Sequence, residues 1–253
     1  MAGAQAVPPA AVPPAFDVAS IRVNTSPEIR WRMEQTVDGI TATGVTLDWV
    51  MHEAYLENAA QQWAPGPGWL ETTRFNIEAK FDPARYPHPS QEDRQAMLQG
   101  LLADRFHLAI HHEQREYDLL ELRRTKKDLK LVQSKPDEVH HSSLDGHAMC
   151  SISRSGRGYL KMQGCTVEDL TSVLNSAADG ELGRVIVDRT GLTDRYSLEL
   201  RWSRTPLDAT PTEGSTAPDL RTALREQLGL QLTATRGPLD TIVIDRVEMP
   251  SQN

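Results

Sequence analysis

Histidines beside carboxylates are the first residues of this sequence whose types and spacing suit chemistry. His107, His111, His112 and Glu113 lie in a segment whose alternating apolar residues predict a strand. At about 3.3 Å per residue, His107 and His111 would lie roughly 13 Å apart along one face, and His112 would point to the other face. Zn–N bonds of about 2.0 Å require a tighter group, so we expect no metal here.

A second group, His140, His141 and His147, lies among acidic residues in the polar stretch 125–147. A loop folds around a metal ion more freely than a strand does, but a charged linker is the commoner explanation of such a stretch. The histidine patterns therefore predict neither a metal nor a cofactor.

Local signatures of a nucleophile or a nucleotide site do not occur. There is no Gly-x-Ser-x-Gly elbow, and Ser155 is explained as a turn residue. No Gly-rich loop joins a strand to a helix, as a phosphate site requires. Glu78 and Glu199 alternate with apolar residues, which predicts that they face solvent.

Two tryptophans, Trp63 and Trp69, flank the rigid segment Ala64-Pro65-Gly66-Pro67-Gly68. Two flat rings held near each other suit a platform for a sugar or a peptide. The same rings suit a plug over the edge of a domain, and we favour the plug.

The two cysteines, Cys150 and Cys165, flank two short alternating runs joined by the turn sequence Ser155-Gly156-Arg157-Gly158. A hairpin there would bring the cysteines together. In an oxidising compartment a disulfide closing this loop would contribute roughly 3 kcal/mol. We favour the disulfide over two buried free thiols.

Bulk composition excludes several classes of function. The chain has 253 residues and a formal net charge of −8, which argues against a nucleic-acid partner. It contains no apolar run of about 18 residues, so no transmembrane segment is expected. The length fits two domains of about 100–130 residues.

Three sequence blocks recur in the same order at nearly constant offset. Gly44–Val50 returns 120 positions later as Gly164–Leu170, and Arg74–Phe81 returns 121 positions later as Arg195–Trp202. A spaced apolar set returns 122 positions later, so that Leu98, Leu102, Phe106, Leu108 and Ile110 match Leu220, Leu224, Leu228, Leu230 and Leu232. This recurrence predicts two tandem similar domains.

Each copy reads β-β-α-β-α-β-β, an α+β unit with two helices packed on a small mixed or antiparallel sheet. We expect an Ala/Pro-rich disordered tail at 1–15, a first unit at 16–124, a polar linker at 125–147 and a second unit at 148–253. Ala4-Gln5-Ala6 also fits the end of a secretory leader, so a trimmed exported protein is an alternative explanation of the tail.

Several phrases resemble a large family of uncharacterised exported proteins known chiefly from Acidobacteria. They include Phe16–Ile21, Arg74–Lys80, Leu101–Phe106, Val187–Tyr196 and Val243–Glu248, and the resemblance covers nearly all of 16–253. It implies a domain of unknown function and an envelope or extracellular location, and it brings no activity. The position of Cys165 departs from the family pattern, so the resemblance does not imply the disulfide.

Each half also weakly resembles the short N-terminal modules of secretins and TonB-dependent transporters, which are docking domains. This likeness concerns the fold. Together these observations favour an exported, periplasmic or extracellular, non-catalytic binding or docking module, with an envelope protein or an extended peptide as partner. The alternative is a hydrolase with its site at the interdomain cleft.

Overall fold

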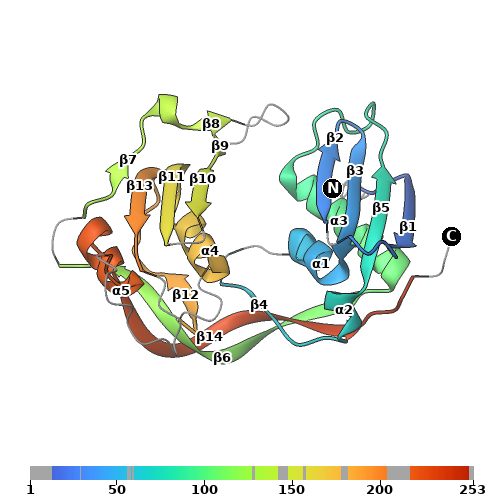
Figure 1. The fold of residues 1–253 in the computed structure, drawn as a ribbon. Coiled ribbons are helices and arrows are strands. Elements are labelled where there is room, and N and C mark those ends of the chain that lie inside the picture. Colours follow the sequence, from blue (N-terminus) through green and yellow to red (C-terminus); the bar gives the residue numbers. More distant parts are fainter. Residues whose placement is uncertain are drawn as a thin grey trace, which may run out of the picture. The chain divides into compact units, whose positions relative to one another are not determined.

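The computed structural model describes residues 13–250 apart from 29, 56–57, 59, 127–128, 142–147, 156–157, 178–181 and 204–216. Within these residues it contains five α-helices and four small sheets (Figure 1), which confirms the predicted α+β class. None of the described helices is long and apolar enough to cross a membrane. Most of the predicted tail lies outside the described residues.

The chain forms two compact units, each assembled from separate segments. Unit 1 comprises Met1–Leu56, Pro65–His111 and Ile244–Asn253, and unit 2 comprises Glu57–Ala64 and His112–Val243. This division follows contacts in space, and it does not test the domain boundaries predicted from the repeat.

Unit 1 contains an antiparallel sheet of order β1-β5-β3-β2. Its strands are β1 (Val18–Val23), β2 (Arg32–Thr36), β3 (Gly39–Thr46) and β5 (Arg74–Lys80). Its helices are α1 (Leu47–Tyr55), α2 (Trp69–Thr72) and α3 (Gln91–Phe106).

Local chemistry explains where these elements begin and end. The predicted Asp38-Gly39 turn is confirmed, since Thr36 pairs with Gly39 where β2 meets β3. The Asp38 carboxylate accepts hydrogen bonds from the Thr36 hydroxyl (2.7 Å) and the Lys80 ammonium (2.9 Å). Thr46 before an apolar helical pattern predicts a helix N-cap, and the structure confirms it, since the Thr46 hydroxyl accepts from the backbone N–H of Trp49 (3.3 Å) at the start of α1.

The start of α3 is held by a capping box. The Ser90 hydroxyl accepts from the Asp93 N–H (3.1 Å), and the Asp93 carboxylate accepts from the Ser90 N–H (2.8 Å). The alternation of Phe106, Leu108 and Ile110 predicts a strand that begins at 106, and this prediction is wrong at Phe106, which belongs to α3. His107, with φ 50°, ends the helix in the left-handed region.

The core of unit 1 follows the alternation of β5. Phe75, Ile77 and Ala79 are buried, whereas Asn76 and Glu78 are exposed. The Phe75 ring meets the edge of the Phe106 ring with centroids 5.3 Å apart. Burial of both rings fastens α3 to the sheet.

Unit 2 contains the second sheet, of order β10-β11-β13-β7. Its strands are β7 (Val132–Gln133), β10 (Ser151–Ser155), β11 (Tyr159–Cys165) and β13 (Tyr196–Arg201). Its helical segments are α4 (Val167–Ala177), α5 (Leu220–Ala223) and η2 (Leu224–Leu228). The apolar faces of the helices and strands form one core, which includes Leu160, Leu170, Leu200, Leu224 and Trp202.

The hairpin of unit 2 closes tightly around Gly158, which has φ +80°. A Cβ at this position would overlap the carbonyl oxygen of Trp202, and the Trp202 N–H donates to the Gly158 carbonyl (2.8 Å). Glycine is therefore required here for both conformation and space.

A third sheet has the order β12-β6-β14-β4, formed by β4 (Gln62–Trp63), β6 (Ala109–Arg124), β12 (Val185–Asp188) and β14 (Leu230–Arg246). β12 is parallel to β6, and β4 is parallel to β14. The sequence predicted separate strands at 106–110 and 117–123, and at 230–235 and 241–247. Each pair is one continuous strand, because the intervening residues keep an extended backbone despite Gly237-Pro238.

The stretch predicted as a linker contains ordered elements. β7 forms the edge of the second sheet beside β13. The 3-10 helix η1 (Pro136–Glu138) follows it, and β8 (His140–His141) pairs with β9 (Ala148–Met149) as the fourth sheet.

Candidate functional site

Unit 1 contains a pocket of about 490 Å³, lined by the residue that precedes β2 and by residues of β3, α1, α2 and β5. Eight residues line it: Trp31, Gly44, Val45, Thr46, Trp49, Glu71, Thr72 and Arg74. The volume falls in the range of about 300–1,000 Å³ typical of small-molecule sites. We call this hollow the Trp31–Trp49 pocket.

Two indole rings form one wall of the pocket. The Trp31 and Trp49 ring centroids lie 5.3 Å apart, with ring planes 42° apart. Trp49 lies in the first turn of α1, and Trp31 directly precedes β2. Trp31 is 63% exposed, so much of its ring remains accessible to a ligand.

A bulge fixes the backbone beneath the rings. The register of β3 against β5 shifts between Ala42 and Val45, and Gly44 within it has φ +66°. The Gly44 N–H donates to the Asn76 amide oxygen (3.0 Å). A Cβ on Gly44 would overlap the carbonyl oxygen of Arg30, so a side chain cannot enter at this point.

Opposite charges complete the lining. Arg74, half-buried at the start of β5, donates through Nη1 to the Glu28 carbonyl oxygen (3.3 Å). Glu71 lies on α2 and is exposed, and the Thr72 hydroxyl donates to the Gly68 carbonyl oxygen (3.1 Å). The pocket thus offers a guanidinium, a carboxylate and an aromatic wall, and it has no net charge from these groups.

The histidines predicted as strand residues each meet a carboxylate. His107 Nε2 lies 3.9 Å from Glu248, and His111 Nδ1 lies 2.9 Å from Asp245. In unit 2, His112 Nδ1 lies 2.8 Å from Asp240.

A hydrogen bond from His112 is the main reason that the pKa of Asp240 is lowered, and the Gln61 amide (2.8 Å) adds to it. The pKa of Glu248 is lowered mainly by its hydrogen bond from Arg246, with His107 contributing. These pairs are half-exposed, so they act as surface ion pairs.

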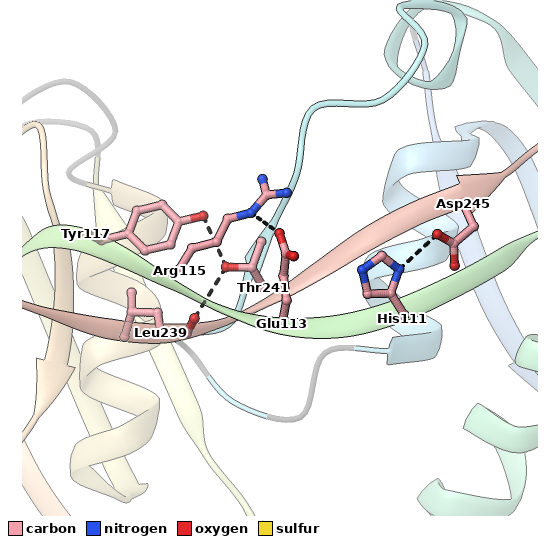
Figure 2. A network of polar contacts seen from close by, with 7 residues as sticks. All are labelled: His111, Glu113, Arg115, Tyr117, Leu239, Thr241 and Asp245. Atoms are coloured by element: carbon pink, nitrogen blue, oxygen red, sulfur yellow. Dashed lines mark hydrogen bonds and ion pairs between the residues drawn. The ribbon is translucent and has the colours of Figure 1, made fainter.

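Figure 2 shows further polar contacts along β6 and β14. Within unit 2, the Tyr117 and Thr241 hydroxyls lie 3.1 Å apart, and Thr241 also donates to the Leu239 carbonyl oxygen (3.3 Å). Glu113 and Arg115 form an ion pair on the same strand. These contacts lie between β6 and β14 or along one of these two strands.

The predicted disulfide between Cys150 and Cys165 is confirmed, with Cα atoms 4.6 Å apart. The turn between β10 and β11 brings the cysteines together, although two of its residues lie outside the description. Among the described residues, one group of three potential metal-ligating side chains is found, formed by these cysteines and Asp169. Bonded sulfurs lack the thiolate charge that metals require, and the Asp169 carboxylate already accepts hydrogen bonds from the Thr166 N–H (2.8 Å) and the Thr166 hydroxyl (2.9 Å).

The remaining predicted site residues are dispersed. His140 and His141 are exposed on β8, and His147 lies outside the described residues. Trp63 lies on β4 in unit 2, whereas Trp69 begins α2 in unit 1, and both are partly buried. The platform and the plug at these tryptophans therefore stay predictions.

Sequence reasoning missed Trp31 and Trp49 as pocket residues. One signal was present in the repeat, where Trp49 stands at the position matched by Asp169 in the second copy. The two recurring sequence blocks therefore differ at this position, because one has a large aromatic side chain where the other has a small charged one.

The model of one protein family, described as "Protein of unknown function (DUF3738)", matches residues 48–247. This span contains 200 of the 253 residues and most of both units. No curated protein and no solved structure matches the chain.

Proposed function

The chain belongs to the DUF3738 family of proteins of unknown function, and on this premise we propose that it is an exported, non-catalytic binding module of the cell envelope. Its ligand occupies the Trp31–Trp49 pocket. The observation that carries this proposal is the open aromatic wall beside two side chains of opposite charge, in a pocket of about 490 Å³.

The proposal includes two tandem similar domains, and a comparison of their matched positions supports the choice of this pocket. The two sheets have matching strand orders: β1-β5-β3-β2 in unit 1 corresponds to β7-β13-β11-β10 in unit 2, which is the order of the second sheet in reverse. Both carry a bulge in the second hairpin strand, with a glycine at φ +66° at Gly44 and at Gly164. Thr46 and Thr166 then cap the helix that follows.

The matched positions differ at the pocket. Arg32 pairs with Thr43, and Ser151 pairs with Gln163, the residue 120 positions after Thr43. Trp31 therefore corresponds to Cys150. In unit 2 this position belongs to the Cys150–Cys165 disulfide, whereas in unit 1 it belongs to Trp31, whose ring contacts Trp49.

The matched arginines differ in the same way. Arg195 donates to the Gly164 carbonyl (2.6 Å) and the Ala148 carbonyl (3.3 Å). Within the described residues, the Arg74 guanidinium makes one hydrogen bond, to the Glu28 carbonyl oxygen (3.3 Å). The guanidinium of unit 1 thus keeps N–H groups for a ligand, whereas that of unit 2 is used to hold the backbone.

Export is supported by the disulfide, because such bonds persist in oxidising compartments. The envelope location, the relation to Acidobacterial proteins and the docking role suggested by secretin modules are parts of the same proposal. Edge strands such as β2 and β10 offer unpaired backbone groups to an extended peptide or an envelope protein.

A screen of small-molecule fragments by ligand-observed NMR tests the proposal. The wild type is compared with Trp31→Ala and with the control Val37→Ala, which removes an apolar side chain that is 76% exposed outside the pocket. Fragments that bind the wild type and the control but not Trp31→Ala support the proposal. Equal binding to all three proteins contradicts it, and turnover of a bound fragment would favour the alternative hydrolase.

A further inference from the structure

We infer that the Trp31–Trp49 pocket binds a neutral oligosaccharide built of pyranose rings. This inference rests on the proposed binding function and names the chemical class of its ligand. Three properties of the pocket carry it: the aromatic wall, the balanced polar groups and the rigid floor.

The aromatic wall suits the apolar face of a sugar ring. The face of an indole carries negative charge density, and the axial C–H groups of a pyranose are weakly positive, so the two surfaces attract as they stack. Trp31 and Trp49 contact each other at 5.3 Å and 42°, which gives a bent surface broader than one ring. A bent surface of two rings matches consecutive sugar units better than a single flat ring.

The polar groups supply both kinds of partner that hydroxyl groups need. Arg74 donates only, Glu71 accepts only, and the Thr46 and Thr72 hydroxyls can do both. Charge-assisted hydrogen bonds to sugar hydroxyls are stronger than neutral ones. One cation and one anion in the same lining disfavour a strongly charged ligand of either sign, because each such ligand meets one like charge.

The floor of the pocket is fixed before the ligand arrives. The Asn76 amide oxygen accepts hydrogen bonds from the Gly44 N–H (3.0 Å) and from the Asn24 amide (2.9 Å), so the bulge is tied to β5 and, through Asn76, to the residue that follows β1. A fixed floor lowers the entropy cost of binding a ligand that makes many weak contacts. Sugars are ligands of this kind, since each hydroxyl must replace its hydrogen bonds to water.

Isothermal titration and tryptophan fluorescence with cellotriose, chitotriose, laminaritriose and maltotriose test the inference. We expect at least one of these neutral trisaccharides to bind the wild type. Trp31→Ala should weaken that binding by about tenfold or more, because stacking is lost, and Trp31→Phe by less. Arg74→Met should also weaken it, while Val37→Ala should leave it unchanged.

The outcomes separate the two proposals. If no trisaccharide binds at about 10 mM, but fragments of another class bind in a way that depends on Trp31, the sugar inference is wrong and the binding function stands. If nothing binds in a way that depends on Trp31, both are wrong. Circular dichroism of each variant establishes that a lost signal does not come from unfolding.

Discussion

Replacing Cys150 and Cys165 together with alanine should lower the free energy of unfolding of unit 2 by about 3–4 kcal/mol. The cysteines are 15 positions apart, and a disulfide that closes a loop of this length restricts the unfolded chain by about 3 kcal/mol. Cys165 is 1% exposed within the core of unit 2, so the lost sulfur adds up to about 1 kcal/mol. With a urea dependence of about 2 kcal/mol per molar, the midpoint should fall by about 1.5–2 M.

Urea titration followed by hydrogen exchange and mass spectrometry measures this change unit by unit. Peptides from β10, β11 and β13 should lose protection at lower urea concentration in the variant, while peptides from β3 and β5 keep their wild-type midpoint. Wild-type protein treated with a reducing agent should shift in the same direction. Identical midpoints for oxidised wild type, reduced wild type and the variant would refute the reasoning.

Three other predictions concern single positions. In urea titrations, Gly158→Ala should lower the free energy of unfolding by about 2 kcal/mol or more, because φ is +80° and the added Cβ would overlap a carbonyl oxygen. Gly237→Ala has open space around its Cβ and should change the free energy of unfolding by under about 0.5 kcal/mol. Ser90→Ala should cost about 1 kcal/mol in thermal unfolding, because α3 loses its capping box. Asp240→Asn should cost under about 1 kcal/mol at pH 7, as expected for a half-exposed partner of His112.

The Asp240 prediction has a definite dependence on pH. The pKa of this carboxyl is lowered in the folded state, so its contribution is present above the unfolded pKa near 4 and is lost as the pH falls through the folded pKa. Wild type and Asp240→Asn should therefore converge below about pH 4. A stability difference that grows on acidification would contradict this account.

The predictions for Gly158→Ala and Ser90→Ala can also be contradicted directly. Equal stability of Gly158→Ala and Gly237→Ala would mean that the hairpin of unit 2 relaxes without cost. A Ser90→Ala variant as stable as the wild type would mean that water satisfies the first turn of α3 as well as the serine does.

Elements defined by local signals were predictable from the sequence. The Asp38-Gly39 turn, the caps at Thr46 and Ser90, and the hairpin that joins Cys150 to Cys165 each depend on residues close together in the chain. Such signals act over a few residues, where side-chain and backbone chemistry determine the conformation.

Elements defined by distant partners were not predictable. β4 has two residues, too few to show periodicity, and it exists because it pairs with β14, which lies far away in the sequence. The continuity of β14 through Gly237-Pro238 was also missed, since this dipeptide predicts a turn when it is considered alone.

The pocket escaped prediction for a related reason. Trp31 and Trp49 are separated by a hairpin and the start of a helix, and the register of β2 on β3 brings them together. Trp63 and Trp69 drew attention because they are close in sequence, but they belong to different units.

The interleaved segments of the two units constrain how the protein is made. Unit 1 takes its last segment from Ile244–Asn253, where the Glu248 N–H donates to the Phe106 carbonyl (2.7 Å). A nascent chain that has produced only the first 200 residues therefore lacks part of both units. Final folding of unit 1 therefore has to wait until its segment beginning at Ile244 has been synthesised.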